Sequence, residues 1–146
     1  MSKSDSWESD ILKLLFQAVA SANIADNAAS SPVTSLFVSL HTADPGETGN
    51  QTTNEIAYTS YARVGVLRQS GAGGWTVSGT SPTQVTPTDG ALSFPACTGG
   101  TGTATHFGIG TLSSGAGKLL YSGSLSPSIA VSTGVTPQPT ITVTED

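Results

Sequence analysis

Residues 36–46 read Leu-Phe-Val-Ser-Leu-His-Thr-Ala-Asp-Pro-Gly, and this stretch decides the fold. Leu36, Val38 and Leu40 recur with period two, which is typical of a strand that buries one face. We therefore expect a strand over Ser35–Thr42. The Asp-Pro-Gly that follows predicts a turn, because proline presets φ and glycine tolerates positive φ.

The same pattern continues to the end of the chain. Short apolar runs alternate with Gly, Ser, Thr and Pro, which is typical of strands separated by turns. We expect further strands over Tyr61–Gln69, Trp75–Ser78, Gln84–Thr86, Ala91–Phe94, Ala104–Thr111, Leu119–Leu125, Ile129–Val131 and Thr140–Glu145. The sequence thus predicts a mainly β protein, with an antiparallel β-sandwich or jelly roll of about eight strands over residues 33–146.

One amphipathic helix is expected before the strands, over Asp5–Ala20. Ser4 or Asp5 can cap it, and acidic residues near its start suit the positive end of a helix. An apolar stripe follows helical spacing and comprises Trp7, Ile11, Leu14, Leu15, Ala18 and Val19, widened by Leu12 and Phe16. With the polar linker Ser21–Pro32, the helix forms an expected N-terminal arm over residues 1–32. It packs either on its own subunit or on a neighbouring subunit or partner.

Charge is scarce, since only 10% of the 146 residues are charged and the net charge is −5. The five cations, Lys3, Lys13, Arg63, Arg68 and Lys118, form no cluster along the sequence. We therefore expect no direct binding of nucleic acid, which needs cations to neutralise phosphates, and no binding to an anionic membrane.

The single cysteine, Cys97, excludes an intrachain disulfide and is expected to be a small buried residue. No apolar run approaches the ~20 residues of a transmembrane helix, and the polar, acidic start does not resemble a signal peptide. We expect assembly in a host cytoplasm.

The residues that can carry chemistry form no recognisable motif. His41 and His106 have no metal-ligand spacing to a second His or Cys, and we interpret both as hydrogen-bonded strand residues. Asp44, Glu47 and Glu55 do not follow the EF-hand pattern and are expected to be solvated. The Gly-Gly-Thr-Gly-Thr at 99–103 lacks the lysine of a phosphate loop. We expect no catalytic residue, no metal and no cofactor.

Glu47–Ser60 is polar and predicts a long exposed loop, which is commonly a binding element. The large aromatic residues of the strand region are expected in the core or between sheets. Arg63 is expected to pair with an acid or to stack on a ring.

Six motifs occur in a characteristic order: Leu-Phe-Val-Ser-Leu-His-Thr-Ala-Asp-Pro at 36–45, Ser-Tyr-Ala-Arg-Val at 60–64, Gly-Trp-Thr-Val-Ser-Gly at 74–79, Leu-Ser-Phe-Pro-Ala at 92–96, Thr-His-Phe-Gly-Ile at 105–109 and Leu-Leu-Tyr-Ser-Gly-Ser-Leu at 119–125. In this order the chain resembles a family of small structural proteins of tailed-bacteriophage virions. Members include capsid cement or decoration proteins and proteins labelled as tail fibres. The resemblance implies a structural role and transfers no catalytic residue.

The leading hypothesis is a capsid cement protein on the capsid exterior that binds across capsomer seams and stabilises the shell. Its expected partners are the major capsid protein and further copies of itself, as a dimer or trimer. The residues expected at these interfaces are Trp7, Ile11, Leu15, Glu47, Asn50, Glu55 and Tyr58.

Three other hypotheses stay open. The second hypothesis is a tail-fibre or tail-base component, although the chain lacks the sequence repeats that many fibres have. The chain can be a carbohydrate-binding module if Trp75 and Tyr58 are exposed for stacking on sugars. An enzyme is the fourth hypothesis, and the sequence supplies no coherent active site for it.

Overall fold

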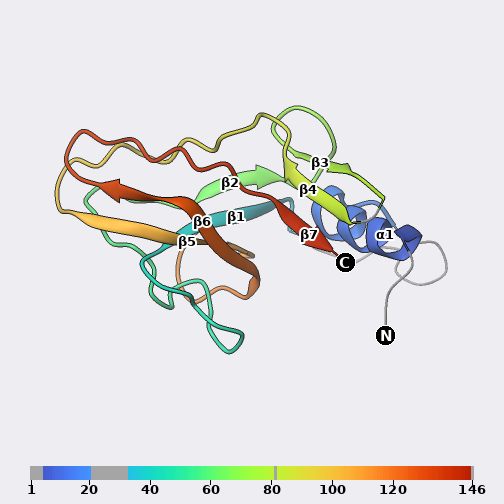
Figure 1. Cartoon of the computed structure of the whole chain (residues 1–146), viewed down its shortest axis with the longest axis horizontal. Helices are drawn as coiled ribbons and strands as arrows, with labels where there is room; N and C mark the ends of the chain where they lie inside the picture. Colours follow the sequence, from blue (N-terminus) through green and yellow to red (C-terminus); the bar gives the residue numbers. More distant parts are fainter. Residues whose placement is uncertain (1–4, 21–32, 81, 146) are drawn as a thin grey trace. The chain divides into compact units, whose positions relative to one another are not determined.

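The computed structural model describes residues 5–20, 33–80 and 82–145, and the chain divides into two compact units (Figure 1). The helix unit comprises Met1–Ser35, Val66–Gly90 and Thr142–Asp146, and the sheet unit comprises Leu36–Gly65 and Ala91–Ile141. Each unit is therefore built from segments that are distant in sequence. The linker Ser21–Pro32 lies outside the described residues.

Strand β1 (Ser35–His41) lies inside a four-stranded sheet of order β2-β1-β5-β6. The other members are β2 (Val64–Leu67), β5 (Gly102–Gly110) and β6 (Leu119–Val131). The β1–β5 and β5–β6 pairs are antiparallel, and Leu40 lies opposite Phe107. Leu36, Val38 and Leu40 are buried, which confirms the predicted apolar face of this strand.

The helix unit contains α1 (Asp5–Gln17) and a three-stranded antiparallel sheet of order β3-β4-β7. The strands are β3 (Trp75–Ser78), β4 (Thr83–Pro87) and β7 (Val143–Glu145), and α1 contacts β3 and β4. Leu12 and Phe16 are fully buried, and the Phe16 ring packs edge-on against the Trp75 ring with 4.6 Å between the ring centroids. The described part of the helix thus packs on its own chain.

The end of the helix corrects the predicted boundary at Ala20. The helix ends at Gln17, because Ala18 adopts a positive φ of 57°. Arg68 donates hydrogen bonds from Nη2 to the Leu14 carbonyl and from Nε to the Leu15 carbonyl, at 2.8 and 2.6 Å. These bonds satisfy carbonyls that the last turn leaves without helical partners.

The described residues contain seven strands where about eight were predicted. The predicted strands Leu119–Leu125 and Ile129–Val131 are one continuous strand, β6. The predicted strand Ala91–Phe94 is irregular, although the N–H groups of Leu92 and Phe94 donate to the carbonyls of Pro139 and Pro137. Proline has no N–H to donate in return, so this pairing cannot complete a ladder.

Two further predicted strands are too long, since Tyr61–Gln69 shortens to Val64–Leu67 and Thr140–Glu145 to Val143–Glu145. A third, Ala104–Thr111, shifts to Gly102–Gly110. The structure is mainly β with two antiparallel sheets and one N-terminal helix, as predicted. A sandwich or jelly-roll arrangement of the sheets stays a prediction, as does the division into an arm over 1–32 and a β-domain over 33–146.

Candidate functional site

A buried ion pair holds the loop between β1 and β2. Arg63 donates from Nε to Glu55 Oε1 and from Nη2 to Glu55 Oε2, both at 2.7 Å. The Arg63 side chain is 2% exposed and that of Glu55 15%. The Tyr61 hydroxyl donates to Glu55 Oε1 at 2.9 Å and accepts the Leu40 N–H at 3.0 Å. The pair with an acid that the sequence predicted for Arg63 is confirmed.

The remaining donors of Arg63 reach a second loop, since Nη1 donates to the Leu112 carbonyl at 2.9 Å and Nη2 to the Gly115 carbonyl at 2.8 Å. One guanidinium therefore fixes two loops to each other. The hydrogen bond to Glu55 raises the pKa of Arg63, and burial raises the pKa of Tyr61 far above its usual value. Arg63 is charged and Tyr61 neutral, as these bonds require.

His41 is likewise bound into the interior of the sheet unit. Its Nδ1 lies 2.8 Å from the Thr53 carbonyl, which can only accept, so Nδ1 carries the proton. Its Nε2 lies 2.8 Å from the Ser39 hydroxyl. Burial lowers the pKa of His41, while the Thr53 carbonyl acts in the opposite direction. Both histidines are hydrogen-bonded strand residues as predicted, since His106 lies in β5 with Nδ1 2.9 Å from Thr105 Oγ1.

Gln51 is a structural residue that the sequence did not reveal. Its side chain is fully buried, accepts the Leu112 N–H at Oε1 (2.9 Å) and donates from Nε2 to the Leu112 carbonyl (3.2 Å). A Cβ on Gly110 or Gly117 would overlap this amide, so both glycines make room for it. The predicted exposed loop Glu47–Ser60 is therefore partly wrong, because Gln51, like Ile56 and Tyr58, faces the interior.

The two aromatic residues considered for sugar stacking are both buried. Trp75 is 0% exposed, and Tyr58 is 6% exposed with its hydroxyl donating to the Pro95 carbonyl at 2.8 Å. Neither ring presents a face to a ligand, so the exposure that a carbohydrate-binding role of these two residues requires is not met. Cys97 is buried, as expected for a small core residue.

The residues expected at an interface are spread over both units. Glu47 is exposed, Ile11, Leu15 and Asn50 are half-buried, and the side chain of Trp7 lies outside the described residues. The amide oxygen of Asn50 accepts the N–H and the hydroxyl of Thr52, at 2.9 and 2.7 Å. The interface role of these residues, and of Glu55 and Tyr58, stays a prediction.

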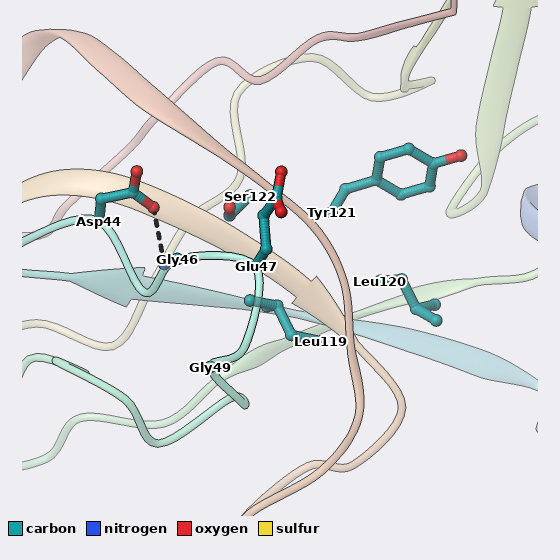
Figure 2. Close-up of a pocket in the computed structure, with 8 residues that line it drawn as sticks. All are labelled: Asp44, Gly46, Glu47, Gly49, Leu119, Leu120, Tyr121 and Ser122. Atoms are coloured by element: carbon teal, nitrogen blue, oxygen red, sulfur yellow. Dashed lines mark hydrogen bonds between the residues drawn. The ribbon is translucent and has the colours of Figure 1, made fainter.

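A pocket of about 430 Å³ lies between the 44–49 loop and the start of β6 (Figure 2). Asp44 and Glu47 line it from the loop and are exposed, and Leu119–Ser122 line it from the strand. Asp44 Oδ1 accepts the Gly46 N–H at 2.9 Å, which shapes the turn after β1. The pocket thus combines exposed carboxylates with half-buried apolar side chains.

Within residues 5–20, 33–80 and 82–145, no three His, Cys, Asp or Glu side chains gather in a way that could hold a metal ion. No helix among these residues is long and apolar enough to cross a bilayer.

The fold and these contacts define a class of small β-sheet proteins whose loops are locked by internal polar bonds. A family model described as "Podophage GP4 fiber I protein gp80" matches residues 2–143, nearly the whole chain. The chain belongs to this family of phage fibre proteins and is therefore a structural protein of the virion, which confirms the predicted resemblance. Among curated proteins, none matches the chain significantly.

Proposed function

We propose that this chain is a non-enzymatic building unit of a virion fibre. The description of the family supports the fibre location. The supporting structural observation is the Arg63–Glu55 pair with the bonds of Arg63 to the Leu112 and Gly115 carbonyls. These charged groups are engaged in holding two loops together. A rigid surface for contact with neighbours is what a structural component needs.

A capsid cement protein on the capsid exterior, bound to the major capsid protein, is the second candidate. The observation that favours it is the absence of any internal sequence repeat, since many fibres are built from repeats. A compact unit that binds across a seam would stabilise the shell by mass action, without chemistry.

The copy number of the chain separates the two candidates. We would quantify it in purified virions by mass spectrometry, relative to the major capsid protein. A fibre component is expected at a small fraction of the capsid protein, whereas a cement protein is expected at a comparable number. Gold-labelled antibody on intact virions gives the location independently. Absence of the chain from purified virions would contradict both candidates.

The non-enzymatic part of the proposal has its own test. Purified chain is expected to leave host cell-wall and capsule glycans uncut over long incubation. Any cleavage that His41→Gln or Glu55→Gln abolishes, while the variant stays folded by circular dichroism, would overturn it.

A further inference from the structure

Exposed apolar side chains gather at a pocket of the helix unit. Among the described residues, four large apolar side chains are 42–49% exposed: Val19, Val33, Leu67 and Leu112. Val33 and Leu67 line this pocket, and so does Ala18, which directly precedes Val19. Apolar side chains that gather on a surface mark contact sites, whereas single ones are ordinary. This apolar pocket is therefore a candidate contact site.

The apolar pocket is small and offers no free charge. Its volume is about 260 Å³, below the roughly 300–1,000 Å³ of sites for small-molecule ligands, so it suits one inserted side chain. Among its described lining residues only Arg68 is charged. Each guanidinium nitrogen of Arg68 already donates to a backbone carbonyl, those of Leu14, Leu15 and Val33. The pocket thus suits a neutral partner with one apolar side chain.

The fourth exposed side chain, Leu112, belongs to the sheet unit and lies in the loop between β5 and β6. Its N–H donates to Gln51 Oε1 at 2.9 Å, and its carbonyl accepts from Gln51 Nε2 at 3.2 Å and from Arg63 Nη1 at 2.9 Å. Gln51 and Arg63 are both buried. The backbone of Leu112 is therefore fixed while its side chain stays exposed, and a group held in position in advance loses less conformational entropy on binding.

The loop around Leu112 is as neutral as the pocket. Residues 110–117 read Gly-Thr-Leu-Ser-Ser-Gly-Ala-Gly and carry no charge. Leu112 is the one large side chain among them, since the others are glycine, alanine, serine or threonine. The loop is a narrow, neutral segment that offers a single large apolar side chain.

We propose that Leu112 of one copy inserts into the apolar pocket of the next copy, in a head-to-tail contact. The exposed leucine and the pocket match in size and polarity. An acidic or basic segment of another protein would find no free opposite charge there, so a second copy accounts better for both features. Because the two contacting surfaces differ, each copy offers Leu112 to one neighbour and its pocket to another, which extends the assembly.

This inference rests on the proposed fibre unit for its biological purpose and adds the contact that joins neighbouring units. Sedimentation velocity of the purified full chain over a concentration series measures this contact independently of copy number in the virion. The wild type is expected to form species larger than a dimer as the concentration rises. Leu112→Ser and Leu67→Ser should each weaken self-association about tenfold or more, because each removes apolar area from the contact. Ala116→Ser, at an exposed residue of the same loop, is the matched control and should leave it unchanged.

Mixing the two variants tests whether the two surfaces bind each other. The Leu112→Ser chain keeps the pocket, and the Leu67→Ser chain keeps the inserting leucine. Their mixture should therefore form a 1:1 heterodimer that does not grow further, although neither variant associates alone at that concentration. Val33→Ser replaces Leu67→Ser if circular dichroism shows that the latter is unfolded.

Several outcomes would overturn the proposal. They are a wild type that is monomeric at all concentrations or stops at a dimer, an equal effect of Ala116→Ser, and a mixture without heterodimer. Association that survives Leu112→Ser but not Leu67→Ser would show instead that the apolar pocket pairs with itself.

Discussion

Arg63 donates a hydrogen bond to each carboxylate oxygen of Glu55, with two N–O distances of 2.7 Å, and neither side chain is more than 15% exposed. The fork geometry of the guanidinium permits this bidentate contact while leaving donors for the Leu112 and Gly115 carbonyls. The pair therefore determines the course of two loops at once.

Replacing Glu55 by glutamine should destabilise the fold markedly. Removing one partner of a buried pair leaves the other charge uncompensated, so the free energy of unfolding should fall by about 3 kcal/mol. Arg63→Lys should cost nearly as much, because an ammonium cannot reproduce the fork. Urea unfolding measures both. Lys118→Gln, at an exposed cation, is the control and should change stability by less than about 0.5 kcal/mol. Equal effects of all three would show that the pair contributes nothing.

Arg68 should anchor the end of α1. Arg68→Met keeps an apolar stem but removes the donors to the Leu14 and Leu15 carbonyls, so we expect a loss of about 1–2 kcal/mol. Hydrogen exchange of the α1 amides should accelerate more than that of β5. Gln69→Ala, an exposed neighbour bonded only locally to Ala72, serves as control. Uniform acceleration across the chain would instead indicate global destabilisation.

The sequence predicted the elements that depend on local periodicity. Leu36, Val38 and Leu40 revealed the buried face of β1, and Trp75–Ser78 was predicted at its observed bounds. The sequence did not predict the elements whose structure depends on residues distant in the chain. The irregular pairing of residues 91–94 depends on the prolines at 137 and 139. Nothing in the sequence of either segment indicates that the two segments pair.

The candidate site shows the same division. Arg63 was expected either to pair with an acid or to stack on an aromatic ring, and the structure shows the acid, Glu55. Gln51 looked like any residue of a polar loop, since its burial depends on two glycines about 60 residues away, at 110 and 117. A glutamine is buried there because the loop carbonyl and N–H of Leu112 require partners.

Gly110→Ala should test how closely Gln51 is packed. The added methyl would overlap the Gln51 side chain, so we expect about 1–3 kcal/mol of destabilisation from overpacking. Gln51→Ala removes the obstacle but takes away the acceptor of the Leu112 N–H, at a cost of about 2 kcal/mol, while the Leu112 carbonyl keeps its bond from Arg63. The loss of unfolding free energy in the double variant should be smaller than the sum of the two single losses by at least about 0.5 kcal/mol. The reason is that the added methyl group occupies the space that the Gln51 side chain leaves. Additive losses in chemical denaturation would show that the two residues do not compete for space.

Acid should weaken the fold through His41. Burial lowers the pKa of this ring in the folded protein, whereas in the unfolded chain it titrates near its usual value of about 6.5. Above that pH the ring is neutral in both states and its contribution is complete. As the pH falls below it, the unfolded chain binds a proton that the folded ring resists, so stability declines by up to about 1.4 kcal/mol per pH unit until the folded ring titrates as well.

Urea unfolding at a series of pH values between neutrality and mild acid measures this decline. His41→Gln keeps a donor for the Thr53 carbonyl but cannot titrate, so its stability should vary less with pH over the same interval. Ser39→Ala, which removes the hydroxyl beside Nε2 but retains the imidazole, is the control and should keep a decline of the same sign. An identical pH profile for wild type and His41→Gln would rule out this ring as the source. A neutral, doubly bonded His41 therefore stabilises the fold more at neutral pH than in mild acid, and this part of the pH dependence should disappear with the imidazole.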